Sequence, residues 1–237
     1  MSLLKTSGDF FFKYRNALFP VIFLSLFFVS APAPVLLLPQ DLLLITLGIT
    51  LVIFGQGFRL AVIGYAYIKR GGKEGKVYAD DLVVRGFYAH SRNPMYVGNI
   101  SVVLGLCILY GSFWSLFVMI PLFLFIYLSI TVAEETYLRA RFGAQYEAYE
   151  KNVPRFWPNF KGIKDSLKEF TYDGKKALRK DYGNVFQNLF AAVFIAAWKF
   201  YFYAGNAVFY VAAPAFALLV AFYIWARFLK KTARLAS

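Results

Sequence analysis

Residues 113–133 read FWSLFVMIPLFLFIYLSITVA, an apolar run without a charged side chain. A helix that crosses a bilayer needs about 20 mostly apolar residues, so this stretch predicts a membrane-spanning helix. Five more stretches approach or reach that length, at residues 17–38, 42–68, 95–111, 185–204 and 207–226. We therefore predict an all-α integral membrane protein with about six transmembrane helices.

Short turn sequences separate these stretches and pair them into three predicted hairpins. The turns are Pro39-Gln40-Asp41, Gly111-Ser112 and Gly205-Asn206, which carry typical turn residues. The first stretch has a second interpretation, because basic residues precede an apolar run that ends in Val29-Ser30-Ala31, as in a signal sequence. Its removal would leave the orientation of the other spans unchanged.

The distribution of charge predicts the orientation. The chain has 237 residues, 59% of them hydrophobic and 16% charged, with a formal net charge of +13. Such a charge suggests nucleic-acid binding, but the basic residues concentrate in segments 1–16, 69–94, 161–184 and 227–237. With six spans these segments and the neutral segment 134–160 share one side, which the positive-inside rule makes cytoplasmic. Both termini are then cytoplasmic, and no nucleic-acid partner is expected.

The same pattern suggests three parts. We predict a membrane core at 1–160, a basic interfacial segment at 161–184, and a transmembrane hairpin with a basic tail at 185–237. The interfacial segment has a weak apolar stripe of Leu167, Phe170, Ala177 and Leu178, which predicts a helix lying along the membrane surface. A solvated basic linker explains that segment nearly as well.

Residues 80–99 form the densest polar cluster and end where the third span begins. Pro94 suits the first turn of that helix and Asn93 the cap before it. The helix N-terminus then opens at the cytoplasmic interface, where its amides can hold a carboxylate. A polar loop with an ordinary cap is the alternative.

Three charged residues in the spans also call for an explanation. Glu134 and Glu135 lie side by side at the inner end of the fourth span, where a cationic ligand would stabilise them; the alternative is pairing with Arg139 and Arg141. Arg59, inside the second span, needs an acidic partner, for which Glu134 or Glu135 are the predicted candidates, or it extends to the membrane surface.

Several separated motifs agree in order and spacing with one enzyme family. They are Gly86-Phe87-Tyr88, the run from Arg92 to Gly98, Glu134-Glu135, Leu138, Phe142-Gly143, Tyr146, Tyr149 and Val153-Pro154. Over residues 45–160 the chain resembles the isoprenylcysteine carboxyl methyltransferase family and the related phospholipid N-methyltransferases. The resemblance implies a membrane-embedded enzyme that uses S-adenosylmethionine and forms S-adenosylhomocysteine.

The resemblance also implies where the cofactor binds. Carried over by position, the cofactor-binding residues are Asp80, Asp81, Leu82, Val83, Tyr88, Asn93, Pro94, Met95, Tyr96, Glu134 and Glu135. The chemistry of these residues agrees with that implication. The ammonium and sulfonium of the cofactor suit the two carboxylates, and its carboxylate suits the helix N-terminus.

The chain departs from the family pattern at two chemically important positions. Asn93 stands where many members have histidine, so the side chain at this position cannot ionise. Ile130 stands where members acting on prenylcysteine have an arginine that holds the substrate carboxylate, which weakens the case for that substrate. Arg59 and Arg155 are the predicted substrate-binding replacements.

We therefore predict O-, N- or S-methylation of a lipophilic, membrane-associated acceptor at the cytoplasmic interface. The cofactor would enter from the cytoplasm and the acceptor laterally from the lipid. Glu135, His90 or Tyr149 could take a proton from an amine or thiol acceptor. A sterol-type NADPH reductase, or a non-enzymatic transporter or assembly protein, are the alternatives. One histidine and one distant cysteine, Cys107, predict no metal site, and the sequence carries no signal of oligomeric state.

Overall fold

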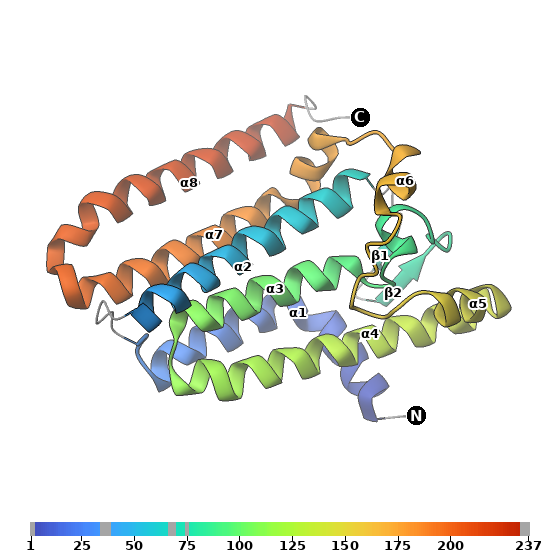
Figure 1. The fold of residues 1–237 in the computed structure, drawn as a ribbon, viewed down its shortest axis with the longest axis horizontal. Helices are drawn as coiled ribbons and strands as arrows, with labels where there is room; N and C mark the ends of the chain where they lie inside the picture. Colours follow the sequence, from blue (N-terminus) through green and yellow to red (C-terminus); the bar gives the residue numbers. More distant parts are fainter. Residues whose placement is uncertain (1–2, 34–38, 66–69, 74–75, 233–237) are drawn as a thin grey trace.

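The computed structural model describes residues 3–33, 39–65, 70–73 and 76–232. Its long helices run beside one another in an elongated bundle (Figure 1). They are α1 (Leu3–Val29), α2 (Pro39–Tyr65), α3 (Pro94–Tyr110), α4 (Ile120–Phe142, entered through the π-helical turn Ser115–Met119), α7 (Gly174–Ala204) and α8 (Phe209–Lys231). Two short helices, α5 (Ala144–Asn152) and α6 (Ile163–Lys168), and two 3-10 turns, η1 (Gly86–Ala89) and η3 (Gly205–Val208), lie between them.

Within these ranges, four stretches are long and apolar enough to cross a membrane: Leu3–Val29, Asp41–Tyr65, Ser115–Phe142 and Gly174–Lys231. The last contains both α7 and α8, which fold back on each other (Figure 1). The apolar helix α3 has 17 residues and is shorter. This helical content suits an integral membrane protein, and the crossing of the bilayer by all six helices stays a prediction.

Two helices begin earlier than predicted. Helix α1 starts at Leu3 rather than at residue 17, and α7 starts at Gly174 rather than at residue 185. Residues 174–184 therefore belong to a long helix rather than to a separate interfacial one. Charged side chains in these first turns hid the helices from a reading based on hydropathy, because hydropathy detects the apolar part of a helix and not its continuation into water.

The predicted all-α fold class is confirmed by the long helices, and a short hairpin at residues 70–73 and 76–79 is an addition that was not predicted. Strands β1 (Arg70–Lys73) and β2 (Lys76–Ala79) form an antiparallel hairpin in which residue 70 pairs with residue 79 and residue 73 with residue 76. Each strand has only four residues, and β1 consists of basic residues and glycines. The hairpin therefore lacks the alternation of apolar side chains by which a strand is recognised in sequence.

The polar segments gather at one end of the bundle. The β1–β2 hairpin, α5, α6 and the last turns of α8 lie together there (Figure 1). This arrangement agrees with the charge pattern, which placed residues 69–94 and 134–184 on one side. The assignment of that side to the cytoplasm stays a prediction.

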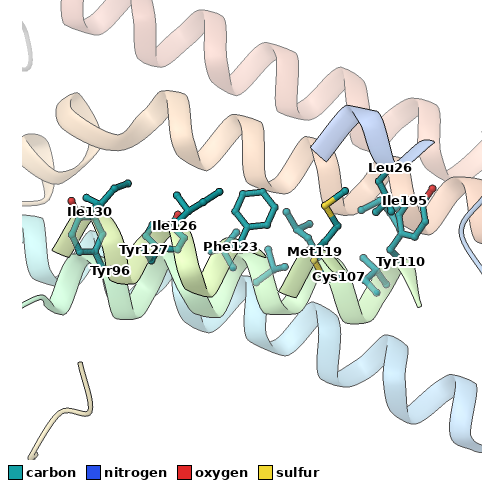
Figure 2. Close-up of a cluster of buried hydrophobic side chains, with 14 of the residues drawn as sticks. Leu26, Tyr96, Cys107, Tyr110, Met119, Phe123, Ile126, Tyr127, Ile130 and Ile195 are labelled. Carbon is teal, nitrogen blue, oxygen red and sulfur yellow. The ribbon is translucent and has the colours of Figure 1, made fainter. Parts of the chain in front are cut away.

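An apolar core extends along α3 and α4. Its buried side chains include Tyr110, Met119, Phe123, Ile126 and Ile130, and Ile195 of α7 joins them (Figure 2). Helix α1 joins this core through Phe19, whose ring packs in a T-shaped arrangement on two rings of the core. The ring centroids lie 5.5 Å apart for Phe123 and 5.4 Å apart for Tyr127. This core holds α1, α3 and α4 together beneath the polar end.

Helices α2 and α3 approach closely through two reciprocal pairs of glycines. A Cβ at Gly55 would lie 2.5 Å from the carbonyl oxygen of Gly98, and one at Gly98 would lie 2.8 Å from that of Gly55. Gly48 and Gly105 meet in the same way, at 2.8 and 2.6 Å. Small residues at such crossings allow backbone contact, which drives helix association in lipid.

Gly55→Ala is expected to destabilise the protein by about 1–3 kcal/mol, because the added methyl group meets backbone atoms that cannot move aside. Gly57→Ala is the matched control on the same helix, since a Cβ there has no heavy atom within 4 Å. Unfolding of the purified variants in detergent measures the difference. Equal stabilities for the two variants would contradict the glycine contact.

Candidate functional site

The candidate site lies where α3 begins and α4 ends. Pro94 occupies the first turn of α3, as predicted. The side chain of Asn93 makes no cap hydrogen bond; its Nδ2 instead donates to the carbonyl oxygen of Arg155, at 3.2 Å, and to Oε1 of Glu135, at 3.4 Å. The predicted side-chain cap is therefore wrong, because the amide of Asn93 is drawn toward the end of α4.

The first amides of α3 are largely engaged by the chain itself. The backbone N–H groups of Tyr96 and Val97 donate to the carbonyl oxygen of Asn93, at 3.0 and 3.3 Å. The helix N-terminus is thus less open to an anion than its sequence indicated.

The carboxylate of Glu135 is bound by two arginines, Arg155 and Arg92. Glu135 is 2% exposed, and Arg155 donates to its Oε2 from Nε and Nη2, at 3.0 and 2.8 Å. Nη2 of Arg92 lies 3.4 Å from Oε1 of the same carboxylate. Two guanidinium groups and the Asn93 amide thus compensate the buried charge of Glu135.

Glu134 has different surroundings. It is 8% exposed, and the hydroxyl of Tyr96 donates to its Oε1 at 2.7 Å. Nη1 of Arg15, from α1, donates to the same hydroxyl at 3.2 Å. Tyr96 therefore stands between a carboxylate and a guanidinium that come from different helices.

Arg92 also belongs to a second ion-pair network, which joins it to Glu150 and Arg139. Nη1 of Arg92 lies 2.6 Å from Oε1 of Glu150 on α5, and Arg139 donates to Oε2 of Glu150. Burial lowers the pKa of Arg92, but the hydrogen bond to Glu150 and the charge of Glu135 outweigh it and raise that pKa above its usual value. Burial likewise raises the pKa of Glu150, but the hydrogen bonds from Arg139 and Arg92 outweigh it and lower the pKa.

Glu150→Gln is expected to lower the free energy of unfolding at pH 7 by about 1 kcal/mol, because its side chain is 24% exposed and water screens the pair. The folded-state pKa of Glu150 is depressed, so its contribution is fully present above the unfolded pKa, about 4.3. It is lost as the pH falls through the lower folded-state pKa.

The stability gap between wild type and Glu150→Gln, measured by denaturant unfolding in micelles, should close as the solution is acidified below about pH 4. Glu147→Gln, an exposed position on the same short helix, is the control and should show little gap at any pH. A gap for Glu150→Gln that does not depend on pH would contradict the ion-pair network.

The three predicted proton acceptors are all held in place by hydrogen bonds. Glu135 is bound by two arginines, and the hydroxyl of Tyr149 donates to the carbonyl oxygen of Tyr88 at 2.6 Å. Nδ1 of His90 bonds the carbonyl oxygen of Asn159 and Nε2 lies 2.9 Å from Oγ of Ser166. A carbonyl oxygen only accepts, so Nδ1 carries the proton and Nε2 accepts from the serine. A role in proton transfer stays a prediction for each of them.

The remaining predicted cofactor residues divide between two apolar clusters and the surface. Leu82 packs beside Tyr146 and Tyr149, while Val83 and Met95 pack against the cluster of Val62, Phe87 and Tyr88. Asp80 and Asp81 are both exposed. Among the predicted cofactor residues, hydrogen bonds thus join Asn93 to Glu135 and Tyr96 to Glu134. Contacts between any of these residues and a cofactor stay predictions.

Segment 161–184 contributes to the site rather than lying apart from it. Leu167 and Ile163 of α6 pack against the cluster of Val62, Phe87 and Tyr88. Phe170 approaches Gly86 in η1, where an added Cβ would lie 3.4 Å from its ring. The apolar stripe predicted for the membrane surface therefore packs, at Leu167 and Phe170, under the loop that precedes α3.

Arg59 has a different partner from the one predicted. Its Nε donates to Oδ2 of Asp181 at 3.1 Å and its Nη2 to Oδ1, and its Nη1 donates to Asn99. Asp181 is 1% exposed and lies on α7. The pairing with Glu134 or Glu135 is wrong because α7 begins early enough to bring an acid of its own against α2.

This ion pair belongs to a polar network between α2 and α7. Gln56 donates to Oδ2 of Asp181 at 2.7 Å, and Asn184 donates to Oδ1 at 2.8 Å. Asn188 in turn donates to Gln56 at 2.8 Å. Positions 181, 184 and 188 follow the helical spacing of one face, a signal that could have identified this contact from sequence.

Replacing one member of the pair, as in Arg59→Leu or Asp181→Leu, should cost about 3–5 kcal/mol, since the other charge stays buried without its partner. The double variant should be less destabilised than the sum of the two single ones. Thermal unfolding of the three variants in detergent measures this coupling. Additive losses would contradict a direct ion pair in the folded protein.

The described part of the chain contains no group of three or more histidine, cysteine or acidic side chains arranged to hold a metal ion. The structure also adds site residues that sequence reasoning missed, namely Arg15, Arg92 as an ion-pair partner, Glu150 and Asp181. From the sequence, Arg15 contributes to the positive charge of segment 1–16 and to the basic residues that precede the first apolar run.

Comparison with known proteins places the resemblance on part of the chain. Residues 43–145, less than half of the chain, match the model of the family described as phospholipid methyltransferase. The protein-S-isoprenylcysteine O-methyltransferase of Schizosaccharomyces pombe is 45% identical over 74 residues, which are 31% of this chain and 31% of that protein. The match thus spans about a third of the length of the relative. No solved structure matches the chain.

Both matches are to methyltransferases by name, and they confirm the resemblance noted in the sequence. The family match includes Asn93, Tyr96, Glu134 and Glu135. Helix α1 with Arg15, and α7 with Asp181, lie outside it.

Proposed function

We propose that this protein is an S-adenosylmethionine-dependent methyltransferase acting on a lipophilic acceptor at the membrane interface. The observation that carries the proposal is the buried Glu134, hydrogen-bonded by Tyr96 in the C-terminal half of α4, within the segment that matches methyltransferases. A buried carboxylate beside a hydroxyl suits the ammonium of the cofactor better than an anion.

The residues fit this cofactor by their chemistry. Glu134 would hold the ammonium, Tyr96 would orient that carboxylate, and the apolar side chains of Leu82, Val83 and Met95 would exclude water. When bound, the cofactor supplies an activated methyl group, whose bond to sulfur breaks as the acceptor's lone pair forms the new bond. The protein then has mainly to align the two reactants, which can be worth about 7–11 kcal/mol.

The acceptor reaches this point from the lipid. Apolar side chains of α3 and α4, among them Ile100, Leu104, Phe123 and Tyr127, form a closed contact with almost no free volume between them. The ring of Tyr127 lies 5.6 Å from that of Tyr96, so this apolar contact adjoins the residue whose hydroxyl contacts Glu134. A hydrocarbon chain that parted α3 and α4 here would place its polar end beside the cofactor.

The contacts favour an acceptor that needs no base. Glu135, His90 and Tyr149 are each engaged in hydrogen bonds or ion pairs, so each would have to give up a partner in order to take a proton. A carboxylate already carries its lone pair, and its charge is neutralised during transfer, which a dry site favours. A carboxylate acceptor would need a cation, and position 130, where the related prenylcysteine enzymes have an arginine, holds a fully buried isoleucine.

Titration of the purified protein with S-adenosylhomocysteine tests the cofactor assignment. Saturable binding is expected for wild type, and Glu134→Gln should weaken it by about tenfold or more, because a buried charged hydrogen bond is worth about 1.5–3 kcal/mol. Glu147→Gln should bind as wild type does. NADPH, added in a separate titration, should not bind.

Lack of saturable binding at millimolar S-adenosylhomocysteine would contradict the proposal, and saturable binding of NADPH instead would favour a reductase. Normal binding by Glu134→Gln would place the cofactor elsewhere. Expression and monodispersity of each variant in detergent establish that a loss of binding is not a loss of folding.

A further inference from the structure

Arg15 differs in its partners from Arg59, Arg92 and Arg155, the other arginines that lie buried or half-buried at the polar end. It is half-buried on α1, donates from Nη1 to the hydroxyl of Tyr96 at 3.2 Å, and lies 4.2 Å from the ring centroid of Phe12. Among the residues that the structure describes, no carboxylate lies within 4.0 Å of its guanidinium.

The contrast with its neighbours is clear in the ion pairs. Arg59 pairs with Asp181, Arg155 with Glu135, and Arg92 with both Glu135 and Glu150. A guanidinium in an apolar helix is costly unless it is paired or reaches water. Arg15 therefore retains a charge for which the described protein supplies a hydroxyl and an aromatic ring, but no anion.

The position of Arg15 is set by the packing of α1 on α4. A Cβ at Gly8 would lie 2.0 Å from the carbonyl oxygen of Ser129, so the two backbones are in contact there. Phe12, 4% exposed, and Arg15 follow Gly8 at helical spacing and share its face. The guanidinium is thus directed toward α4 and the candidate site, rather than toward the lipid.

Tyr96 connects this cation to the carboxylate of Glu134. Its hydroxyl accepts from Arg15 and donates to Glu134, so a cation and an anion flank one phenol. A ligand that meets both needs complementary charges, with a carboxylate toward Arg15 and a cationic group toward Glu134.

We propose that Arg15 binds the carboxylate of a ligand that lies against Tyr96 and Glu134. The carboxylate has two possible sources, which are the amino-acid end of S-adenosylmethionine and a lipophilic acid serving as the acceptor. The cofactor source rests on the proposed function, whereas the lipophilic acid can be tested without it. Arg15 would replace the arginine that is absent at Ile130, and it would do so from outside the segment that matches methyltransferases.

Four probes distinguish the two sources. S-Adenosylhomocysteine carries the amino-acid carboxylate, and 5′-methylthioadenosine lacks it. A fluorescent twelve-carbon fatty acid carries a carboxylate, and its methyl ester does not. Binding of each probe is measured to protein in nanodiscs of zwitterionic lipid, so that lipid headgroups do not compete as anions.

The variants are Arg15→Gln, Arg15→Lys and the control Lys13→Gln. The control removes one positive charge from the same helix at an exposed position. Arg15→Gln should weaken binding of one carboxylate probe by about tenfold, as for loss of a charged hydrogen bond. Arg15→Lys should restore part of the affinity, and Lys13→Gln should have no effect. The two probes without a carboxylate should bind all four proteins alike.

The outcomes separate cleanly. A loss for S-adenosylhomocysteine assigns Arg15 to the cofactor carboxylate, and a loss for the fatty acid assigns it to the acceptor. If both carboxylate probes bind wild type and Arg15→Gln equally, the inference is overturned and Arg15 is a structural anchor. If wild type binds no S-adenosylhomocysteine, the proposed function fails, and the fatty-acid titration alone decides the role of Arg15. If wild type binds neither of the two carboxylate probes, the inference is also overturned.

Discussion

The burial of two adjacent carboxylates, Glu134 and Glu135, is the constraint around which the polar end of this protein is arranged. An ionised carboxylate among apolar helices is stable only with charged or hydrogen-bonding partners. Glu135 obtains them from Arg155 and Arg92, which fastens the chain after α5 and the loop before α3 to the end of α4. Glu134 is bonded by Tyr96, so the same pair of residues also sets how α3 meets α4.

The regions on either side of the family match complete this arrangement. Helix α1 brings Arg15 to the hydroxyl of Tyr96, and α7 brings Asp181 to Arg59. Asn99, which accepts from Arg59, lies one turn beyond Tyr96 on α3. Helices α1 and α7 thus reach neighbouring positions of α3 and α2, and we interpret them as parts of one functional unit.

The apolar helices and the end at which polar segments gather could be predicted from sequence, because length, hydropathy and charge distribution determine them. The place of Pro94 at the start of α3 could also be predicted, because a residue without a backbone N–H fits the first turn of a helix. The cap role of Asn93 and the partner of Arg59 were not predicted correctly. Both depend on which acid or amide the tertiary packing brings near, and residues 93 and 135, or 59 and 181, are too far apart in sequence for spacing to reveal it.

Covalent trapping of the cofactor would test the central claim, that S-adenosylmethionine lies between the start of α3 and the end of α4. Labelled S-adenosylmethionine can be cross-linked to the purified protein by ultraviolet light, and the labelled peptides identified by mass spectrometry. We predict label within residues 80–99 or 134–155, reduced by excess S-adenosylhomocysteine. Label confined to other segments, or label that excess S-adenosylhomocysteine does not reduce, would contradict the account.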